Sequence, residues 1–170
     1  MKIVRLVLLF IVALPLFAAD EMRKLDFLAG EWKGEGWFRM GPGQPEQFTQ
    51  HEKVTPKAGN KALLVEGLGR RKTADGTPGE VVHDALAILG WDEHAKVYRF
   101  STVTAERGAG EPWFEVTGPN AAQWGFETPM GKIRYTISLN EKGQWVEIGE
   151  FTRDGKQWMK MMEMTLTKVK

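Results

Sequence analysis

The 170-residue sequence contains no cysteine, two tyrosines and three histidines. Without cysteine the chain cannot form a disulfide, a thiolate metal site, a cysteine nucleophile or a lipid-modified cysteine, so the folded protein must be stabilised by packing alone. The histidines, His51, His83 and His94, are widely spaced and predict no metal site.

An excess of charge of one sign is also missing. Lys and Arg number 23 against 22 Asp and Glu, which gives a formal net charge of +1. A balanced charge creates no bulk field that would draw the chain to nucleic acid or to an anionic membrane. The sequence also lacks the G-x-S-x-G elbow, the phosphate-binding loop and the HExxH motif, so hydrolases of the familiar kinds are disfavoured.

Large apolar side chains, in contrast, are abundant. The chain holds seven Trp, nine Phe and eight Met, within an ordinary globular composition of 42% hydrophobic and 26% charged residues. Its length suits one domain with a substantial core. Large rings and pliable methionines suit a wide core or an apolar cavity.

The first segment has the pattern of a secretory signal peptide. Basic residues precede an apolar run from Leu6 to Phe17, and Ala18-Ala19 follows. A permanent membrane anchor is the alternative, but about a dozen apolar residues fall short of the ~20 that span a bilayer as a helix. We therefore expect residues 1–19 to be cleaved and residues 20–170 to form a single domain that is periplasmic or secreted.

A short helix is expected after this leader, because Met22, Leu25 and Leu28 recur at near-helical spacing before Gly30. The remaining chain consists of runs of eight to a dozen residues, many of them alternating, between turns rich in Gly, Pro, Asn and Asp. This pattern predicts ten strands, at Glu31 to Met40, Glu46 to Lys57, Lys61 to Lys72, Glu80 to Trp91, Lys96 to Ala105, Pro112 to Thr117, Ala122 to Thr128, Lys132 to Asn140, Gln144 to Arg153 and Lys156 to Lys168.

Every connection between these strands is short enough for an antiparallel hairpin. An open sheet of this kind would leave two exposed edges, whereas closing the sheet removes both. The expected fold is therefore all-β, a ten-stranded antiparallel up-and-down closed β-barrel with the short N-terminal helix plugging one end.

The Gly30-Glu31-Trp32 stretch joins the helix to the first strand. Its glycine lets the chain turn tightly, and its tryptophan is expected to enter the closed end of the barrel. Gly34 and Gly36 share a face with Trp32, which suggests a bend or a close crossing of strands there.

With G-x-W after a short helix and a strand meander behind it, the chain resembles the calycin superfamily of lipocalin-like and fatty-acid-binding-type barrels. More narrowly, it resembles an uncharacterised bacterial family of exported lipocalin-like domains. The stretches that carry this resemblance are Leu25 to Trp32, Met40 to Gly43, Ala62 to Gly67 and His83 to Leu89. It implies a fold and a compartment but brings no established activity.

The resemblance also implies a structural closure built from Gly30, Trp32 and a basic residue late in the last strand. Lys168 matches that position, so we expect its ammonium to lie over the Trp32 ring. The distantly related nitrobindin-type barrels hold haem through a histidine on a late strand. Here the last histidine, His94, precedes the fifth predicted strand, so no haem or other cofactor is expected.

Candidate ligand-binding residues follow from strand position. His83 shares a face with Ala85 and Ala87, whose small side chains would leave room inside; the alternative is a histidine hydrogen-bonded at the barrel rim. The mid-strand carboxylates Glu66, Glu147, Glu150 and Glu163 would need partners if buried, and an outward or salt-bridged role is the simpler interpretation for each. The candidate ligand-binding set is His83, Trp113, Phe114, Tyr135, Glu147, Met162 and Met164, with no catalytic or metal-binding residue.

Three functions remain open from the sequence. The leading hypothesis is a monomeric exported protein that binds a small apolar or amphipathic molecule in a barrel cavity. The second is an interaction module with a filled barrel, whose loops at Gly41 to Pro45 and Arg107 to Glu111 meet a partner protein. The third is an enzyme that uses His or Glu side chains in the cavity, which converging ionisable groups with shifted pKa would favour.

Overall fold

The computed structural model describes residues 21–39 and 41–169, so the predicted signal peptide lies outside the described residues. The described chain forms one 3-10 helix, η1 (Asp26–Leu28), followed by eleven strands. The strands are β1 (Gly30–Phe38), β2 (Glu46–Lys57), β3 (Ala62–Lys72), β4 (Pro78–Asp92), β5 (Val97–Thr104), β6 (Gly108–Gly110), β7 (Trp113–Gly118), β8 (Ala121–Thr128), β9 (Gly131–Leu139), β10 (Trp145–Thr152) and β11 (Met159–Lys168).

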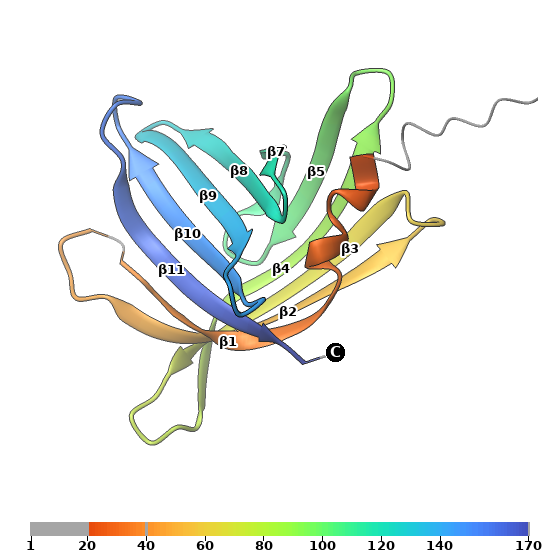
Figure 1. Cartoon of the computed structure of the whole chain (residues 1–170). Coiled ribbons are helices and arrows are strands. Elements are labelled where there is room, and N and C mark those ends of the chain that lie inside the picture. Colours follow the sequence, from red (N-terminus) through yellow and green to blue (C-terminus); the bar gives the residue numbers. More distant parts are fainter. Residues whose placement is uncertain (1–20, 40, 170) are drawn as a thin grey trace, which may run out of the picture.

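All eleven strands belong to one antiparallel sheet in the order β6-β5-β4-β3-β2-β1-β11-β10-β9-β8-β7 (Figure 1). The first and last strands of the predicted meander, β1 and β11, do pair with each other. The sheet nevertheless has two ends, β6 and β7, which are not hydrogen-bonded to one another. It is therefore a curled half-barrel, and the prediction of a closed ten-stranded barrel was wrong in strand number and in closure.

The unpredicted strand, β6, explains the difference. It lies in the segment that was expected to be a loop, and it pairs with β5 over only three residues, so one edge of the sheet is very short. Between β5 and β7, side chains take the place of a backbone ladder: the ring of Phe114 lies 5.5 Å from that of Tyr98 and 5.5 Å from that of Phe100, centroid to centroid. The edges are thus covered without closure.

The N-terminal segment covers one end of the half-barrel. Residues 21–23 and η1 are helical, and Met22, Leu25 and Leu28 are buried in the core as predicted. The indole N–H of Trp32 donates to the carbonyl oxygen of Leu28 at 2.8 Å. Within the described ranges, no helix is long and apolar enough to cross a membrane.

The glycines of β1 allow the close crossing that their spacing predicted. A Cβ on Gly34 would lie 2.0 Å from the carbonyl oxygen of Thr165, and one on Gly36 would lie 2.4 Å from that of Glu163. The predicted contact at this end is also confirmed, since the Lys168 ammonium lies 5.1 Å from the centroid of the Trp32 ring. Gly30 has a φ of 132°, a conformation that side chains rarely adopt.

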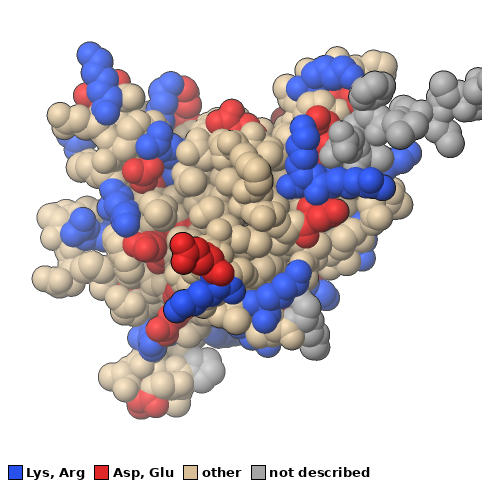
Figure 2. All heavy atoms as spheres, in the orientation of Figure 1, with Lys and Arg blue, Asp and Glu red and all other residues tan. Residues whose placement is uncertain are grey.

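Lys and Arg side chains are interspersed with Asp and Glu over the face drawn in Figure 2. This mixture agrees with the balanced charge of the sequence. No extended area of one sign gathers on this face.

Candidate functional site

Two glutamates point into the interior of the half-barrel. Glu52 on β2 is 7% exposed and Glu147 on β10 is 5% exposed, although carboxylates are seldom buried to this degree. The strands β1 and β11 separate them in the sheet order, so the curl of the sheet brings them to a common interior. They are close enough that the charge of Glu147 raises the pKa of Glu52.

Glycines on β3 make the room for Glu52 and its neighbour. Glu52 pairs with Gly67, and Gln50 pairs with Gly69. A Cβ on Gly67 would lie 2.8 Å from Glu52 Oε1, and one on Gly69 would lie 2.5 Å from Gln50 Oε1. In the space left by these glycines, Gln50 Nε2 donates to Glu52 Oε1 at 2.7 Å.

Two tryptophans hold Glu147. The indole N–H of Trp124 donates to Oε1 and that of Trp145 donates to Oε2, each at 3.1 Å. The Trp124 ring stacks on Tyr135 of β9, with centroids 4.2 Å apart and planes at 15°. Both oxygens of Glu147 are therefore fixed by donors that are themselves packed in place.

Burial dominates the electrostatics of the pair. Burial raises the pKa of Glu52 to about 8. The hydrogen bond from Gln50 lowers this pKa, and the charge of Glu147 raises it. Burial raises the pKa of Glu147 to about 7, against the two indole hydrogen bonds. Among the residues that the structure describes, neither carboxyl has a Lys, Arg or His partner. The pair can hold protons or accept a cation from outside the chain.

Solvent reaches Glu52 and its neighbour Gln50 to a small extent. Of the described side chains that are not exposed, every nitrogen or oxygen shut off from solvent has a hydrogen-bond partner. Glu52 accepts one hydrogen bond, at Oε1, and Gln50 donates that bond without accepting any. The other oxygens, Glu52 Oε2 and Gln50 Oε1, therefore keep some contact with solvent, although their residues are only 7% and 5% exposed.

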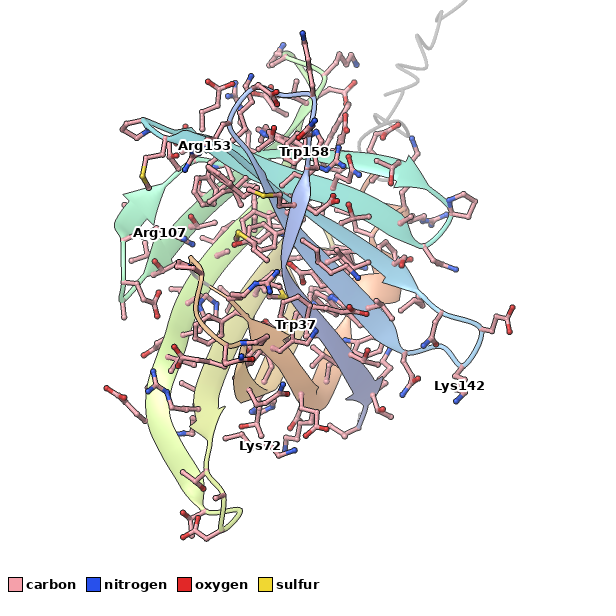
Figure 3. All side chains as sticks on the ribbon, turned by 90° about the vertical axis from the view of Figure 1, so that its left-hand side faces the viewer. Trp37, Lys72, Arg107, Lys142, Arg153 and Trp158 are labelled. Carbon is pink, nitrogen blue, oxygen red and sulfur yellow. The ribbon has the colours of Figure 1, made fainter. Side chains whose placement is uncertain are left out.

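An open hollow of about 510 Å³ lies at the end opposite Trp32, lined by Phe38, Arg71, Glu80, Val81, Val82, Ala105 and Glu106. Arg107 lies at this end (Figure 3), with its guanidinium 4.8 Å from the Phe126 ring centroid. Burial raises the pKa of Tyr135 to about 12, and the Arg107 charge opposes this shift. Arg107 thus reaches from the β5–β6 turn toward β8 and β9.

His83 lies on the inner face at the same end, with its side chain 38% exposed and its Nδ1 3.7 Å from Glu106 Oε2. Burial lowers the pKa of His83, and the Glu106 carboxylate opposes that effect. This position matches the rim histidine that the sequence left open as an alternative. His83 does not join the carboxyl pair in any hydrogen bond of the described residues.

Five of the other predicted ligand-binding residues share the inner face: Phe114, Tyr135, Glu147, Met162 and Met164. Trp113 does not. It precedes Phe114 on the same strand and therefore faces outward, with 43% of its surface exposed, so the prediction that it lines the interior was wrong.

Glu52, Gln50 and Trp124 were not among the residues predicted from the sequence. A signal was present, because Phe48 and Val54 are apolar and share strand parity with Gln50 and Glu52. The outward, salt-bridged interpretation is confirmed for three carboxylates, which pair with lysine or arginine: Glu66 with Lys53, Glu150 with Arg134 and Glu163 with Lys160. It was wrong for Glu147, whose partners are the two indoles.

No protein-family model matches the chain, and no curated protein sequence matches it. Among solved structures, the chain is similar to the crystal structure of Rv2717c from M. tuberculosis, with a TM-score of 0.62 and 13% sequence identity. That likeness covers 88% of this chain and 97% of the other. At this identity the likeness shows the all-β fold alone.

Proposed function

We propose that the chain is an exported, lipocalin-like binding protein that holds a small apolar or amphipathic molecule inside the half-barrel. The observation that carries this proposal is Glu52 Oε2, an oxygen that has no hydrogen-bond partner among the described residues, on a residue that is 7% exposed. A filled barrel would have packed or hydrogen-bonded this oxygen, because a buried polar group without a partner is costly. A ligand is the natural partner of such an oxygen.

The walls suit a molecule with an apolar part. A continuous series of ring contacts runs from Trp91 through Tyr98, Phe114 and Phe100 to Trp124, with centroid separations of 5.0 to 5.5 Å. Met164 adds a pliable side chain beside Glu147, with which it pairs across β10 and β11. An alkyl chain or ring system would contact these groups while a polar end reaches the carboxyl pair. The hollow beside Phe38 is the entrance that we assign.

The test combines native mass spectrometry of protein purified from its own host with fluorescence titration. The indoles of Trp124 and Trp145 contact Glu147, so a ligand that enters should change the tryptophan emission. Ten-carbon amphiphiles below their micelle concentrations serve as probes. A bound species or a saturable emission change supports the proposal. If a well-folded sample shows neither a bound species nor a saturable emission change, the binding proposal is contradicted and the interaction module with a filled barrel is favoured.

Export is part of the proposal and is supported by the basic, apolar and small-residue regions of residues 1–19. Expression of the full chain in a bacterial host, followed by fractionation and mass measurement, tests it. We expect a periplasmic or secreted product that begins near Asp20. A full-length product retained inside the cell would contradict this part without affecting the binding proposal.

An enzyme is the second candidate, and the carboxyl pair favours it. Two converging carboxyls whose pKa values are about 8 and about 7 are suited to proton transfer near neutral pH. Prolonged incubation of each bound amphiphile with the wild-type protein distinguishes the two functions. A catalyst would convert the ligand, and a Glu147→Gln variant would convert it at least 100-fold more slowly. Unchanged ligand recovered by mass spectrometry favours the carrier.

A further inference from the structure

We propose that Glu52 and Glu147 bind the ammonium group of an amphipathic amine, an inference that rests on ligand binding inside the half-barrel. It names the chemical class of the ligand, a cationic head on an apolar body. The carboxyl pair contacts the head, and the ring-lined wall contacts the body.

The first argument is charge. Buried carboxylates are normally paired with a cation, yet the hydrogen bonds to Glu52 and Glu147 come from Gln50, Trp124 and Trp145, all of which are neutral. Two cations at the open end have other partners: Arg71 pairs with Glu46 at 2.7 Å, and Arg107 contacts the Phe126 ring and influences Tyr135. Within the described part of the chain, no basic side chain is paired with either carboxyl. Protons keep the pair largely neutral in the free protein, and a cationic ligand would replace them and pair with the ionised form.

The second argument is hydrogen bonding. An ammonium group carries three N–H donors and no acceptor. The interior offers it Oε2 of Glu52 and Oε1 of Gln50, neither of which accepts a bond from the described residues, and a carboxylate oxygen of Glu147 accepts more than one bond. A ligand carboxylate would find the two indole N–H groups already occupied and would be repelled by the ionised pair. In its ionised form the site is complementary to a donor and not to an acceptor.

The third argument is the aromatic surroundings. The rings of Trp124 and Trp145 border Glu147, and Trp32 contacts Trp145 at 5.8 Å between centroids. Both indoles present their N–H edges to Glu147, and Tyr135 stacks on the Trp124 ring. The rings are therefore suited to contact the apolar body of the ligand, while the carboxyl pair favours an alkylammonium over a neutral alcohol of the same length.

The experiment compares decylamine, decanol and decanoate in fluorescence titrations of the mature wild-type protein near neutral pH. We expect decylamine to bind at least tenfold more tightly than decanol, and decanoate to bind most weakly. Glu52→Gln and Glu147→Gln should each weaken decylamine at least tenfold while changing decanol less than threefold. Glu66→Gln is the matched control, because Glu66 precedes Gly67 on β3 and pairs with Lys53 on the outer face. It should change no affinity.

The outcomes separate this inference from the function on which it rests. Equal affinities for the three probes would overturn the amine preference and leave the binding function standing, whereas no binding of any probe would remove both. Retained decylamine affinity in both Gln variants would overturn the assigned residues.

A variant-free measurement covers the case in which substitution prevents folding. The carboxyl carbon-13 resonances of the wild-type protein should show two glutamates that shift on addition of decylamine and do not shift on addition of decanoate. If no glutamate carboxyl responds to saturating decylamine, the proposal is wrong.

Discussion

Trp32 and Trp145 meet edge to face, with ring centroids 5.8 Å apart and planes at 77°, although β11 separates their strands in the sheet. Each indole N–H is used in a different direction. Trp32 donates to the carbonyl oxygen of Leu28 in the N-terminal segment, and Trp145 donates to Glu147. The covered end of the half-barrel and the carboxyl pair are therefore joined through one aromatic contact.

Replacement of Trp32 by alanine should lower the free energy of unfolding by about 3–5 kcal/mol, because a fully buried ring and its hydrogen bond are lost together. Urea denaturation followed by circular dichroism measures the change. Trp113→Ala makes the same substitution at a 43% exposed position and should cost far less. A Trp32→Ala variant with the wild-type midpoint would show that this contact does not stabilise the fold.

The stability of the protein should fall as the pH rises from about 5 to about 8. Folded Glu52 and Glu147 have pKa values of about 8 and about 7, whereas the unfolded chain loses these protons near pH 4.3. Within this window the folded state binds more protons than the unfolded state, so raising the pH favours unfolding, with a slope of at most about 1.4 kcal/mol per pH unit for each group.

Glu52→Gln and Glu147→Gln each remove one of these titrating groups, so each variant should lose less stability than the wild type as the pH rises. Glu66→Gln should show the same dependence of the free energy of unfolding on pH as the wild type. The pKa of His83 is lowered by burial, so its contribution rises with pH near neutrality and opposes the trend. It is common to all variants and cancels when slopes are compared. Identical slopes in wild type, Glu52→Gln and Glu147→Gln would contradict the assigned protonation.

Gly34→Ala should destabilise the protein by at least about 1–3 kcal/mol, the usual cost of overpacking, because the new Cβ would meet a carbonyl oxygen of β11 at 2.0 Å. Gly118→Ala is the control, since a Cβ there meets nothing within 4 Å. Thermal unfolding of the two variants in parallel makes the comparison. Equal melting temperatures would mean that β1 and β11 separate easily.

Phe114→Ala should loosen the contact between β5 and β7. Its ring contacts both Tyr98 and Phe100, and these strands share no backbone ladder. Amide hydrogen exchange should accelerate at least tenfold in β7 and stay unchanged in β10 and β11. Uniform acceleration across the sheet would indicate global destabilisation and contradict a local role.

Alternation along single strands was sufficient to predict much of the inner face. In β9, Ile133, Tyr135 and Ile137 alternate with polar residues, and this parity is the one that the structure shows. Short β6 could not be predicted, because Gly108, Ala109 and Gly110 carry no alternation and pair with only three residues of β5.

The carboxyl pair shows a different limit. A glutamate within a strand is expected to be exposed, and Glu52 is buried because Gly67 on the next strand leaves room for it and Gln50 satisfies one of its oxygens. That arrangement depends on register between strands, which one sequence does not display. The same applies to Glu147, whose donor Trp124 lies 23 positions away in the chain.

The strands β5 and β7 are joined by ring contacts instead of backbone hydrogen bonds, so we expect them to move apart more easily than other neighbouring strands of the sheet. Displacing neighbouring strands elsewhere breaks ordered hydrogen bonds, whereas rings such as Phe100 and Phe114 can slide past one another with little directional penalty. A ligand bound as proposed would therefore meet the least resistance between β5 and β7, where side-chain contacts alone join the strands.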